Sequence, residues 1–282
     1  MNDHNKTREN VSNAYAKAVT EKKGCCCNAP VQKGVVAKLA GYTEKEIASL
    51  PPDAIINSFG CGNPVALSEL REGDVVLDLG AGASIDILLA AKIIGPKGRA
   101  IGIDMTDEMI TQAKENIATT GLTNLEVRKG VIENLPVETE SIDWVISNCV
   151  INLSPEKSKV FAEIARVLKP GGQMLVSDIV AQDLPDVVRK NKALYNSCVA
   201  GAISEQEYVA GLAQAGLQNI AVRERLVYDA IQLASFFTSE LDQTVQCCGG
   251  GALDPKTLKQ LAETVVGKVY SAKIYARKPN AS

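Results

Sequence analysis

Between Asp74 and Asp178 the chain repeats one pattern, a short apolar run followed by a segment with helical periodicity. The first run, 75–79, ends at a glycine and is typical of a strand buried on both faces. We expect four further strands and two helices between them, the strands at 99–103, 125–128, 142–147 and 173–178 and the helices at 107–119 and 155–168. Strands that alternate with helices predict an α/β fold, a parallel sheet with helices on both faces.

The segments on either side of this core lack its rhythm. Residues 1–70 have helical periodicity only in pieces, at 11–20 and 43–50, and we interpret them as an N-terminal cap that carries cysteines. Residues 71–180 form the central domain. Residues 181–282 are expected to be an α+β segment that completes the sheet and helps to hold the substrate, with helices at 187–200 and 204–215, a strand at 220–227, and a helix and strand within 258–276.

The charge balance excludes several classes of partner. Thirty Lys and Arg residues against 33 Asp and Glu residues give a net charge of −3, which does not provide the basic surface that nucleic-acid binding requires. The most apolar stretch, 85–94, is interrupted by Asp86 and Lys92, so no membrane span is expected. The polar start of the chain, MNDHNKTREN, has no signal-peptide core, and we therefore expect a cytoplasmic protein.

The histidine and cysteine counts limit the kinds of catalytic or ligand-binding site that this chain can form. His4 is the single histidine in 282 residues and lies in a terminal stretch, which nearly excludes histidine-based acid–base catalysis. In a reducing compartment a chain with its own core does not need disulfides, so its cysteines favour metal, metalloid or redox roles. The eight cysteines stand at positions 25, 26, 27, 61, 149, 198, 247 and 248.

A glycine loop follows the first expected strand. Gly80 and Gly82 lie between that strand and a helix, where glycine allows a sharp turn and a close approach of the backbone to a ligand. Asp104 ends the next strand, where an acidic side chain can accept hydrogen bonds from ribose hydroxyls. The third glycine of a dinucleotide fingerprint would fall on Ile85, which argues against NAD. The alternative is a tight turn with no ligand.

A second glycine-containing motif, at residues 168–172, indicates which cofactor the glycine loop binds. Leu168-Lys169-Pro170-Gly171-Gly172 ends a helix before a strand. In combination with Asp78-Leu79-Gly80-Ala81-Gly82 and Asp104, this order resembles class I S-adenosylmethionine-dependent methyltransferases over residues 73–178. The resemblance implies a Rossmann-like domain at 71–180 that binds S-adenosylmethionine.

Three cysteine motifs carry a closer resemblance. Phe59-Gly60-Cys61-Gly62-Asn63-Pro64, Ile146-Ser147-Asn148-Cys149-Val150-Ile151-Asn152-Leu153 and Tyr195-Asn196-Ser197-Cys198 resemble motifs of arsenite methyltransferases, as does Lys129-Gly130-Val131-Ile132-Glu133-Asn134-Leu135-Pro136. The chain departs from the family at Ser84, in the third position of the glycine loop. It also has three consecutive cysteines near its N-terminus, so the redox role of the family's N-terminal cysteine falls on any one of them.

This resemblance implies a role for each motif. Cys61, Cys149 and Cys198 would be the catalytic ligands of arsenic(III). One of Cys25, Cys26 and Cys27 would form a transient disulfide with Cys61, which a thiol reductant, glutathione or thioredoxin, would reduce. The residues implied to bind the cofactor are Phe59, Gly80, Gly82, Asp104, Met105, Ile132, Glu133 and Asn148.

Chemical reasoning supports a metalloid site without deciding it. Cys149 ends a core strand beside the glycine loop, at the edge of the sheet where ligands bind. Three thiolates form a soft site that suits a thiophilic trivalent metalloid. Against this, a buried cysteine is often only a small apolar side chain. The pair Cys247-Cys248, followed by Gly249, is either a metalloid ligand or part of a turn.

The expected activity is transfer of methyl groups from S-adenosylmethionine to arsenite and methylarsenite, as in arsenic detoxification. Two alternatives remain open at this point. One is a methyltransferase of a small organic acceptor such as a quinone precursor, in which the cysteines only pack. The other is a non-enzymatic, thiol-based metalloid sensor or sequestering protein.

Overall fold

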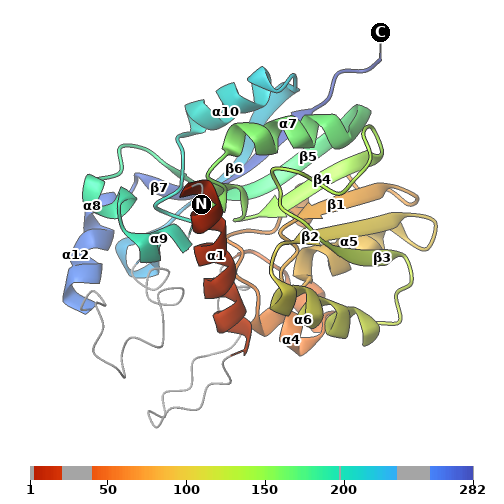
Figure 1. Ribbon diagram of the computed structural model, residues 1–282, viewed down its shortest axis with the longest axis horizontal. Coiled ribbons are helices and arrows are strands. Elements are labelled where there is room, and N and C mark those ends of the chain that lie inside the picture. The colour runs from red at the N-terminus through yellow and green to blue at the C-terminus, as the bar shows by residue number, and fades with distance from the viewer. Residues whose placement is uncertain (1–2, 21–39, 197, 234–254, 282) are drawn as a thin grey trace.

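The computed structural model describes residues 3–20, 40–196, 198–233 and 255–281. A seven-stranded sheet forms its centre (Figure 1), and β7 runs antiparallel to both neighbours while the other pairings are parallel. The predicted α/β class is therefore confirmed, with a mixed sheet. From edge to edge the strands are β3 (Leu125–Lys129), β2 (Arg99–Asp104), β1 (Val75–Leu79), β4 (Ile142–Asn148), β5 (Leu168–Ala181), β7 (Val269–Arg277) and β6 (Gln218–Val227).

Helices cover both faces of this sheet because the strand side chains alternate between two cores. Val76 and Trp144 pack with the apolar helix α5 (Ile85–Ile94) on one face. Leu77 and Val145, the next residues along each strand, pack with α7 (Lys157–Val167) and α10 (Glu205–Gln214) on the other. Helix α6 (Asp107–Ala118) contacts β2 and β3. The central strands are thus buried on both faces, as their apolar sequences predict.

A third apolar cluster lies beyond the C-terminal ends of the strands. It contains all three cysteines of the predicted arsenic site together with residues of α1 (Asp3–Thr20) and α12 (Pro255–Val265). This cluster joins parts of the chain that are far apart in sequence at the edge of the sheet where ligands bind. The shorter elements are α3 (Glu44–Ala48), α4 (Pro52–Ile56), η1 (Val65–Leu67), η2 (Ile151–Leu153), α8 (Asp186–Arg189) and α9 (Lys192–Asn196).

Three predicted boundaries were wrong. The helix expected at 187–200 is two short helices, α8 and α9, and Cys198 beyond them adopts a left-handed φ of 62°. That conformation ends the helical path and lets the Val199 and Ala200 amides donate to the Leu194 carbonyl. Helix α1 begins at Asp3, eight residues before the expected start. Strand β5 begins at Leu168, because Pro170 cannot continue the preceding helix.

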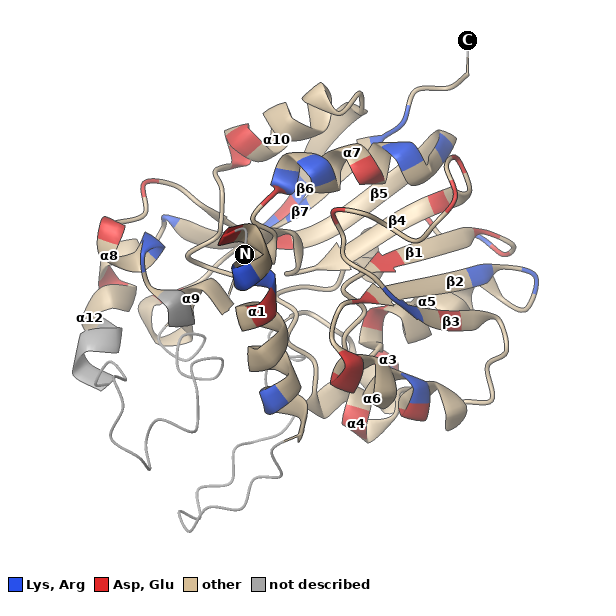
Figure 2. Cartoon of the chain, viewed as in Figure 1, with Lys and Arg blue, Asp and Glu red and all other residues tan. Residues whose placement is uncertain are grey.

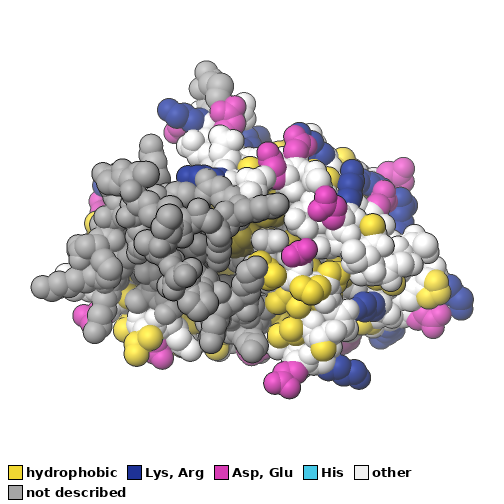
Figure 3. All heavy atoms as spheres, turned by 90° about the horizontal axis from the view of Figure 1, so that it is seen from below, with side chains coloured by type: hydrophobic (Ala, Val, Ile, Leu, Met, Phe, Trp, Pro, Cys, Tyr) yellow, Lys and Arg dark blue, Asp and Glu magenta, His cyan; other side chains and the backbone are white. Residues whose placement is uncertain are grey.

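Some sequence predictions fall outside the described residues, namely those for Cys25, Cys26, Cys27, Cys247 and Cys248. Within the described ranges, no helix is long and apolar enough to cross a membrane. Figure 2 shows Lys and Arg positions distributed along the chain among Asp and Glu positions, and on the face seen in Figure 3 their side chains are interspersed. This distribution is consistent with the nearly balanced charge of the sequence.

A buried polar cluster lies near the C-terminal end of β5. Asp178 of β5 is 1% exposed and accepts hydrogen bonds from Asn152 Nδ2 (2.8 Å), the Ile179 amide (3.0 Å) and Tyr208 Oη (3.3 Å). Burial raises the pKa of Asp178 to about 7, although the Lys157 ammonium and these hydrogen bonds oppose the shift. The folded protein therefore binds this proton more tightly than the unfolded chain does.

We expect this carboxyl group to make stability depend on pH. Its contribution is fully present below the ordinary pKa of an aspartate and is lost as the pH rises toward 7, because the unfolded chain releases the proton first. Asp178→Asn keeps an acceptor for Asn152 and Ile179. It should reduce the change in the free energy of unfolding with pH between about pH 4 and 7. Urea unfolding of both proteins at intervals from pH 4 to 8 measures the difference. Parallel curves would contradict the assignment.

Candidate active site

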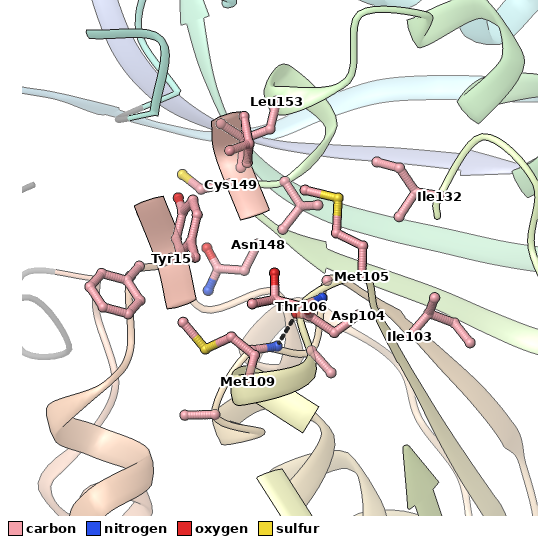
Figure 4. Close-up of a pocket in the computed structure, with 18 of the residues that line it drawn as sticks. Tyr15, Ile103, Asp104, Met105, Thr106, Met109, Ile132, Asn148, Cys149 and Leu153 are labelled. Atoms are coloured by element: carbon pink, nitrogen blue, oxygen red, sulfur yellow. Dashed lines mark hydrogen bonds between the residues drawn. The ribbon is translucent and has the colours of Figure 1, made fainter. Parts of the chain in front are cut away.

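A pocket opens at the C-terminal ends of β1, β2 and β4 (Figure 4). The loops after these strands form its walls, and α1 contributes Arg8, Val11 and Tyr15. All eight residues that the sequence suggested for cofactor binding line this one pocket, as does Cys149. They are Phe59, Gly80, Gly82, Asp104, Met105, Ile132, Glu133 and Asn148.

The glycine loop forms the floor of the pocket. Gly80 and Gly82 have φ of 70° and 49°, a left-handed conformation that glycine adopts without strain. A Cβ at Gly80 would come within 2.4 Å of the Val150 side chain, whereas one at Gly82 would meet no atom closer than 3.9 Å. Gly80 is therefore required for packing against the loop after β4, and Gly82 leaves open space beside its backbone.

Ser84, where the chain departs from the family pattern, has a strained backbone conformation at this turn. It also has a left-handed φ, 79°, and within the described part of the chain its buried hydroxyl has no hydrogen-bond partner. A left-handed conformation disfavours a residue with a Cβ by roughly 1–2 kcal/mol. The position thus has the geometry of a glycine although the sequence supplies a serine.

Ser84→Gly should therefore raise the free energy of unfolding by about 1 kcal/mol, after the larger unfolded-state entropy of glycine is subtracted. Chemical denaturation measures the change. Ser68→Gly is the matched control, since Ser68 has an ordinary φ of −74° and its hydroxyl donates to the Val65 carbonyl. The control should lose stability, and an equal loss at both positions would show that the Ser84 backbone is not strained.

Asp104 lies at the end of β2, where Oδ2 accepts from the Gly82 amide (3.0 Å) and Oδ1 from the Thr106 amide (2.9 Å). Burial raises the pKa of this carboxyl group, and the two backbone donors partly oppose the shift. The carboxylate therefore links the glycine loop to the start of α6. Each oxygen retains a lone pair that can accept from a ligand hydroxyl.

Two further carboxyl groups lie near the glycine loop. Asp86, in the first turn of α5, accepts from Tyr42 Oη (2.7 Å) and from Asn148 Nδ2 (3.0 Å), and burial raises its pKa to about 6. Asp78 is 2% exposed, and its pKa is raised well above its usual range by burial and then by the charges of Asp86 and Asp104. Asp78 and Asp86 are buried and Asp104 is partly buried, and a positively charged ligand beside them would stabilise their ionised forms.

The opposite wall is apolar with one acid at its rim. Met105 and Ile132 line it, and Glu133 follows directly. The Glu133 carboxylate accepts from Ser154 Oγ (2.6 Å) and from Arg8 Nε (3.1 Å), and its side chain is only 6% exposed. A slot with apolar sides and a fixed carboxylate at one end suits a flat heteroaromatic ring with an amino group.

The predicted arsenic ligands lie next to this pocket. Cys61 and Cys149 are joined by a disulfide with a Cα–Cα distance of 5.8 Å, and the buried Cys198 thiol donates to the Cys149 carbonyl. The structure therefore brings the three motifs together, in an oxidised form that sequence reasoning did not consider. Within the described residues, no group of three His, Cys, Asp or Glu side chains is arranged to hold a metal ion.

Asn148 positions the first of these cysteines. Its Oδ1 accepts from the Gly62 amide (3.2 Å), and its Nδ2 donates to the Gly62 carbonyl. A Cβ on Gly60 would lie 2.2 Å from Nδ2, so the loop around Cys61 can approach this side chain only with glycine there. Asn148 thus connects the pocket to the disulfide.

Sequence reasoning missed several residues of the site. Tyr42 and Asp86 form its buried hydrogen-bond network, and Arg8 and Tyr15 come from α1. A signal for Asp86 existed, since a lone acid in an apolar helix directly after a glycine loop is unusual. For α1 the signal was the spacing of Arg8, Val11 and Tyr15, which places them on one helical face.

An α/β sheet with a glycine loop, an acid at the end of β2 and a pocket at the strand ends defines the methyltransferase class, and comparisons agree with it. A methyltransferase-domain family model matches residues 70–216. An arsenic(III) S-adenosylmethionine methyltransferase from Chlamydomonas reinhardtii has a similar crystal structure, with a TM-score of 0.60, 30% identity, and coverage of 87% of this chain and 73% of that one.

Curated relatives indicate which family of methyltransferases this chain belongs to. The arsenite methyltransferase of Halobacterium salinarum is 40% identical over 233 residues, 78% of this chain and 59% of the relative. The human arsenite methyltransferase is 36% identical over 202 residues, 68% of this chain and 51% of the relative. The chain belongs to the arsenite methyltransferase family of class I methyltransferases. It spans little more than half the length of these curated relatives.

Proposed function

We propose that this protein transfers methyl groups from S-adenosylmethionine to trivalent arsenic held by cysteine thiolates, with arsenite and methylarsenite as substrates. The observation that carries the proposal is the position of Cys149. It lines the same pocket as Asp104 and Glu133, and it forms a disulfide with Cys61. Soft ligands for a thiophilic atom thus adjoin a site with the features of a nucleotide-type cofactor pocket.

The pocket residues fit S-adenosylmethionine. Asp104 would accept hydrogen bonds from the ribose hydroxyls, and Met105, Ile132 and Glu133 would surround the adenine. Gly80, Gly82, Phe59 and Asn148 would hold the methionine portion. Burial raises the pKa values of Asp78, Asp86 and Asp104. These acids would favour a cationic sulfonium ligand over its neutral product, because the cation stabilises their ionised forms.

When bound, S-adenosylmethionine supplies an electrophilic sulfonium methyl group. The cysteines would hold arsenic(III) so that its lone pair forms the As–C bond while the methyl–sulfur bond breaks and S-adenosylhomocysteine leaves. Arsenic gives up two electrons in this step, and two thiolates return them by forming a disulfide. The thiolates already make arsenic nucleophilic, so the protein needs no histidine base. Its contribution is the positioning of two reactants in an enclosed site.

A thiol reductant is part of this proposal. The Cys61–Cys149 disulfide occupies two of the three sulfurs that would bind arsenic, so it must be reduced before substrate can enter. Two external thiols, from glutathione or from one thioredoxin, would provide the two electrons and leave as a disulfide. One of Cys25, Cys26 and Cys27 would relay these electrons through Cys61.

The test is direct. Purified protein is incubated with arsenite, labelled S-adenosylmethionine and a dithiol, and the arsenic species are separated and identified. We expect methylarsenite and further methylated products, and no turnover when the dithiol is omitted. Cofactor binding without transfer to arsenite would contradict the proposal. Transfer of the label to a quinone precursor in the same assay would favour an organic acceptor instead.

A further inference from the structure

Helix α1 presents one row of side chains to the pocket. Arg8, Val11, Ser12 and Tyr15 stand at positions i, i+3, i+4 and i+7, which lie along one face of a helix. Arg8, Val11 and Tyr15 line the pocket directly. Figure 1 shows this helix at the front of the molecule, with α8, α9 and α12 on one side of it and β1, β2 and β3 on the other.

The first half of this row contacts the cofactor side. Arg8 donates through Nε to Glu133 Oε1 (3.1 Å) and through Nη2 to Glu156 Oε2 (2.5 Å). Ser12 Oγ lies 3.2 Å from Thr106 Oγ1, and Thr106 is two residues after Asp104 in the sequence. The Arg8 side chain is 18% exposed, so these charges are partly desolvated and their attraction is stronger than at an open surface.

The last residue of the row contacts the cysteine side. Tyr15 Oη donates to the Asn196 carbonyl (3.0 Å), two residues before Cys198. Its ring packs edge-on against Phe59, two residues before Cys61, with ring centroids 5.5 Å apart. Figure 4 shows the Tyr15 side chain next to Cys149 and Asn148. One tyrosine therefore reaches the segments of all three cysteines.

The attachment of α1 is largely polar. Within residues 3–20, Val11 is the one buried side chain, and the partly buried Tyr15 ring packs against Phe59 and the third apolar cluster. Hydrogen bonds and ion pairs add to these contacts. An element with little buried apolar surface detaches at low free-energy cost. Helix α1 can therefore leave the pocket and return without unfolding of the sheet.

We propose that α1 is a clasp that couples occupancy of the cofactor pocket to occupancy of the cysteine site, with Tyr15 as a positioning residue. This inference rests on the proposed function. A cofactor under the helix fixes Glu133 and favours the docked form of α1. Ligation of arsenic by Cys198 fixes the Asn196 carbonyl, the acceptor of the Tyr15 hydroxyl, and favours the same docked form. Two ligands that prefer one state must raise each other's affinity by the same factor.

The experiment measures that factor without turnover. Arsenite is titrated calorimetrically into the dithiol-reduced full chain, alone and with saturating S-adenosylhomocysteine, and the reverse titration checks reciprocity. We expect each ligand to tighten the other about fivefold or more. Tyr15→Phe, which removes only the hydroxyl and one hydrogen bond, should reduce the factor by at least about twofold, toward one. Arg8→Gln should reduce it as well and should also weaken S-adenosylhomocysteine binding.

A matched control separates coupling from a general loss of structure. Tyr270→Phe removes a tyrosine hydroxyl that donates to Glu205 (3.0 Å), remote from the pocket, and should leave the coupling factor unchanged. Amide exchange of residues 3–20 should slow most when both ligands are present. Binding of both ligands with a factor of one, or an unchanged factor in Tyr15→Phe, would overturn the clasp alone. Failure of the reduced protein to bind arsenite would overturn the proposed function and the clasp with it.

Discussion

Cys149→Ser is expected to abolish methylation of both arsenite and methylarsenite, with a loss of about 100-fold or more because the arsenic is no longer fixed against the methyl group. Cys149 directly follows β4 and lines the proposed cofactor pocket. Its amide donates to the Ser177 carbonyl of β5 (2.8 Å), so we expect the sheet to hold this sulfur most rigidly. Cys198 donates to the Cys149 carbonyl, and Cys198→Ser should have the same result.

Cys61→Ser should behave differently toward the two substrates. Arsenite has three exchangeable positions, whereas the As–C bond of methylarsenite does not exchange, so methylarsenite accepts only two thiolates. Cys61 lies in the loop held by Asn148 rather than on a core strand. We therefore expect this variant to lose methylation of arsenite and to retain methylation of methylarsenite.

Product speciation for each variant with each acceptor, under a strong dithiol, measures these outcomes and bypasses any redox role of Cys61. S-adenosylhomocysteine binding serves as the folding control and should match the wild type in all three variants. The assignment of two thiolates to the second round fails if Cys61→Ser is equally inactive toward methylarsenite. It also fails if Cys198→Ser methylates that acceptor at the wild-type rate.

Asp104→Ala is expected to weaken S-adenosylmethionine binding by about 10- to 100-fold, the cost of losing hydrogen bonds to a charged acceptor. The change removes the proposed partner of a ribose hydroxyl and also the acceptor that links the Gly82 and Thr106 amides. Asp104→Asn retains one acceptor oxygen, and its affinity for S-adenosylmethionine should lie between those of the wild type and Asp104→Ala. Arsenite binding by the reduced protein should be unaffected.

Isothermal titration with S-adenosylmethionine measures the three affinities. Asp107→Ala is the matched control, because the Asp107 carboxylate is exposed at the start of α6 and pairs with Lys129 at the surface (2.6 Å). It should bind the cofactor as tightly as the wild type. Equal affinities for Asp104→Ala and the wild type would remove Asp104 from the cofactor site.

The residues that line the proposed cofactor pocket could be placed together from the sequence because their signals are local. Gly80, Gly82 and Asp104 each follow an apolar run that reads as a strand, and parallel strands present their C-terminal ends at one edge of a sheet. The sheet then necessarily brings these residues together, and the Gly82 amide donates to Asp104. The apolar strands and the helix between them determine this geometry before any long-range packing is known.

The cysteine site and the α1 contacts were decided by the tertiary structure. Cys61 and Cys149 are 88 residues apart, and the sequence alone left Cys61 equally free to pair near the N-terminus, since spacing does not specify which thiols meet. The left-handed turn at Cys198 ends a helical path that periodicity extended to residue 200. Local sequence determined the elements of this protein and the edge of the sheet where its ligands bind. Which polar face of α1 covers that edge, and which sulfurs meet there, depended on contacts between distant segments, for which hydrophobic periodicity carries no information.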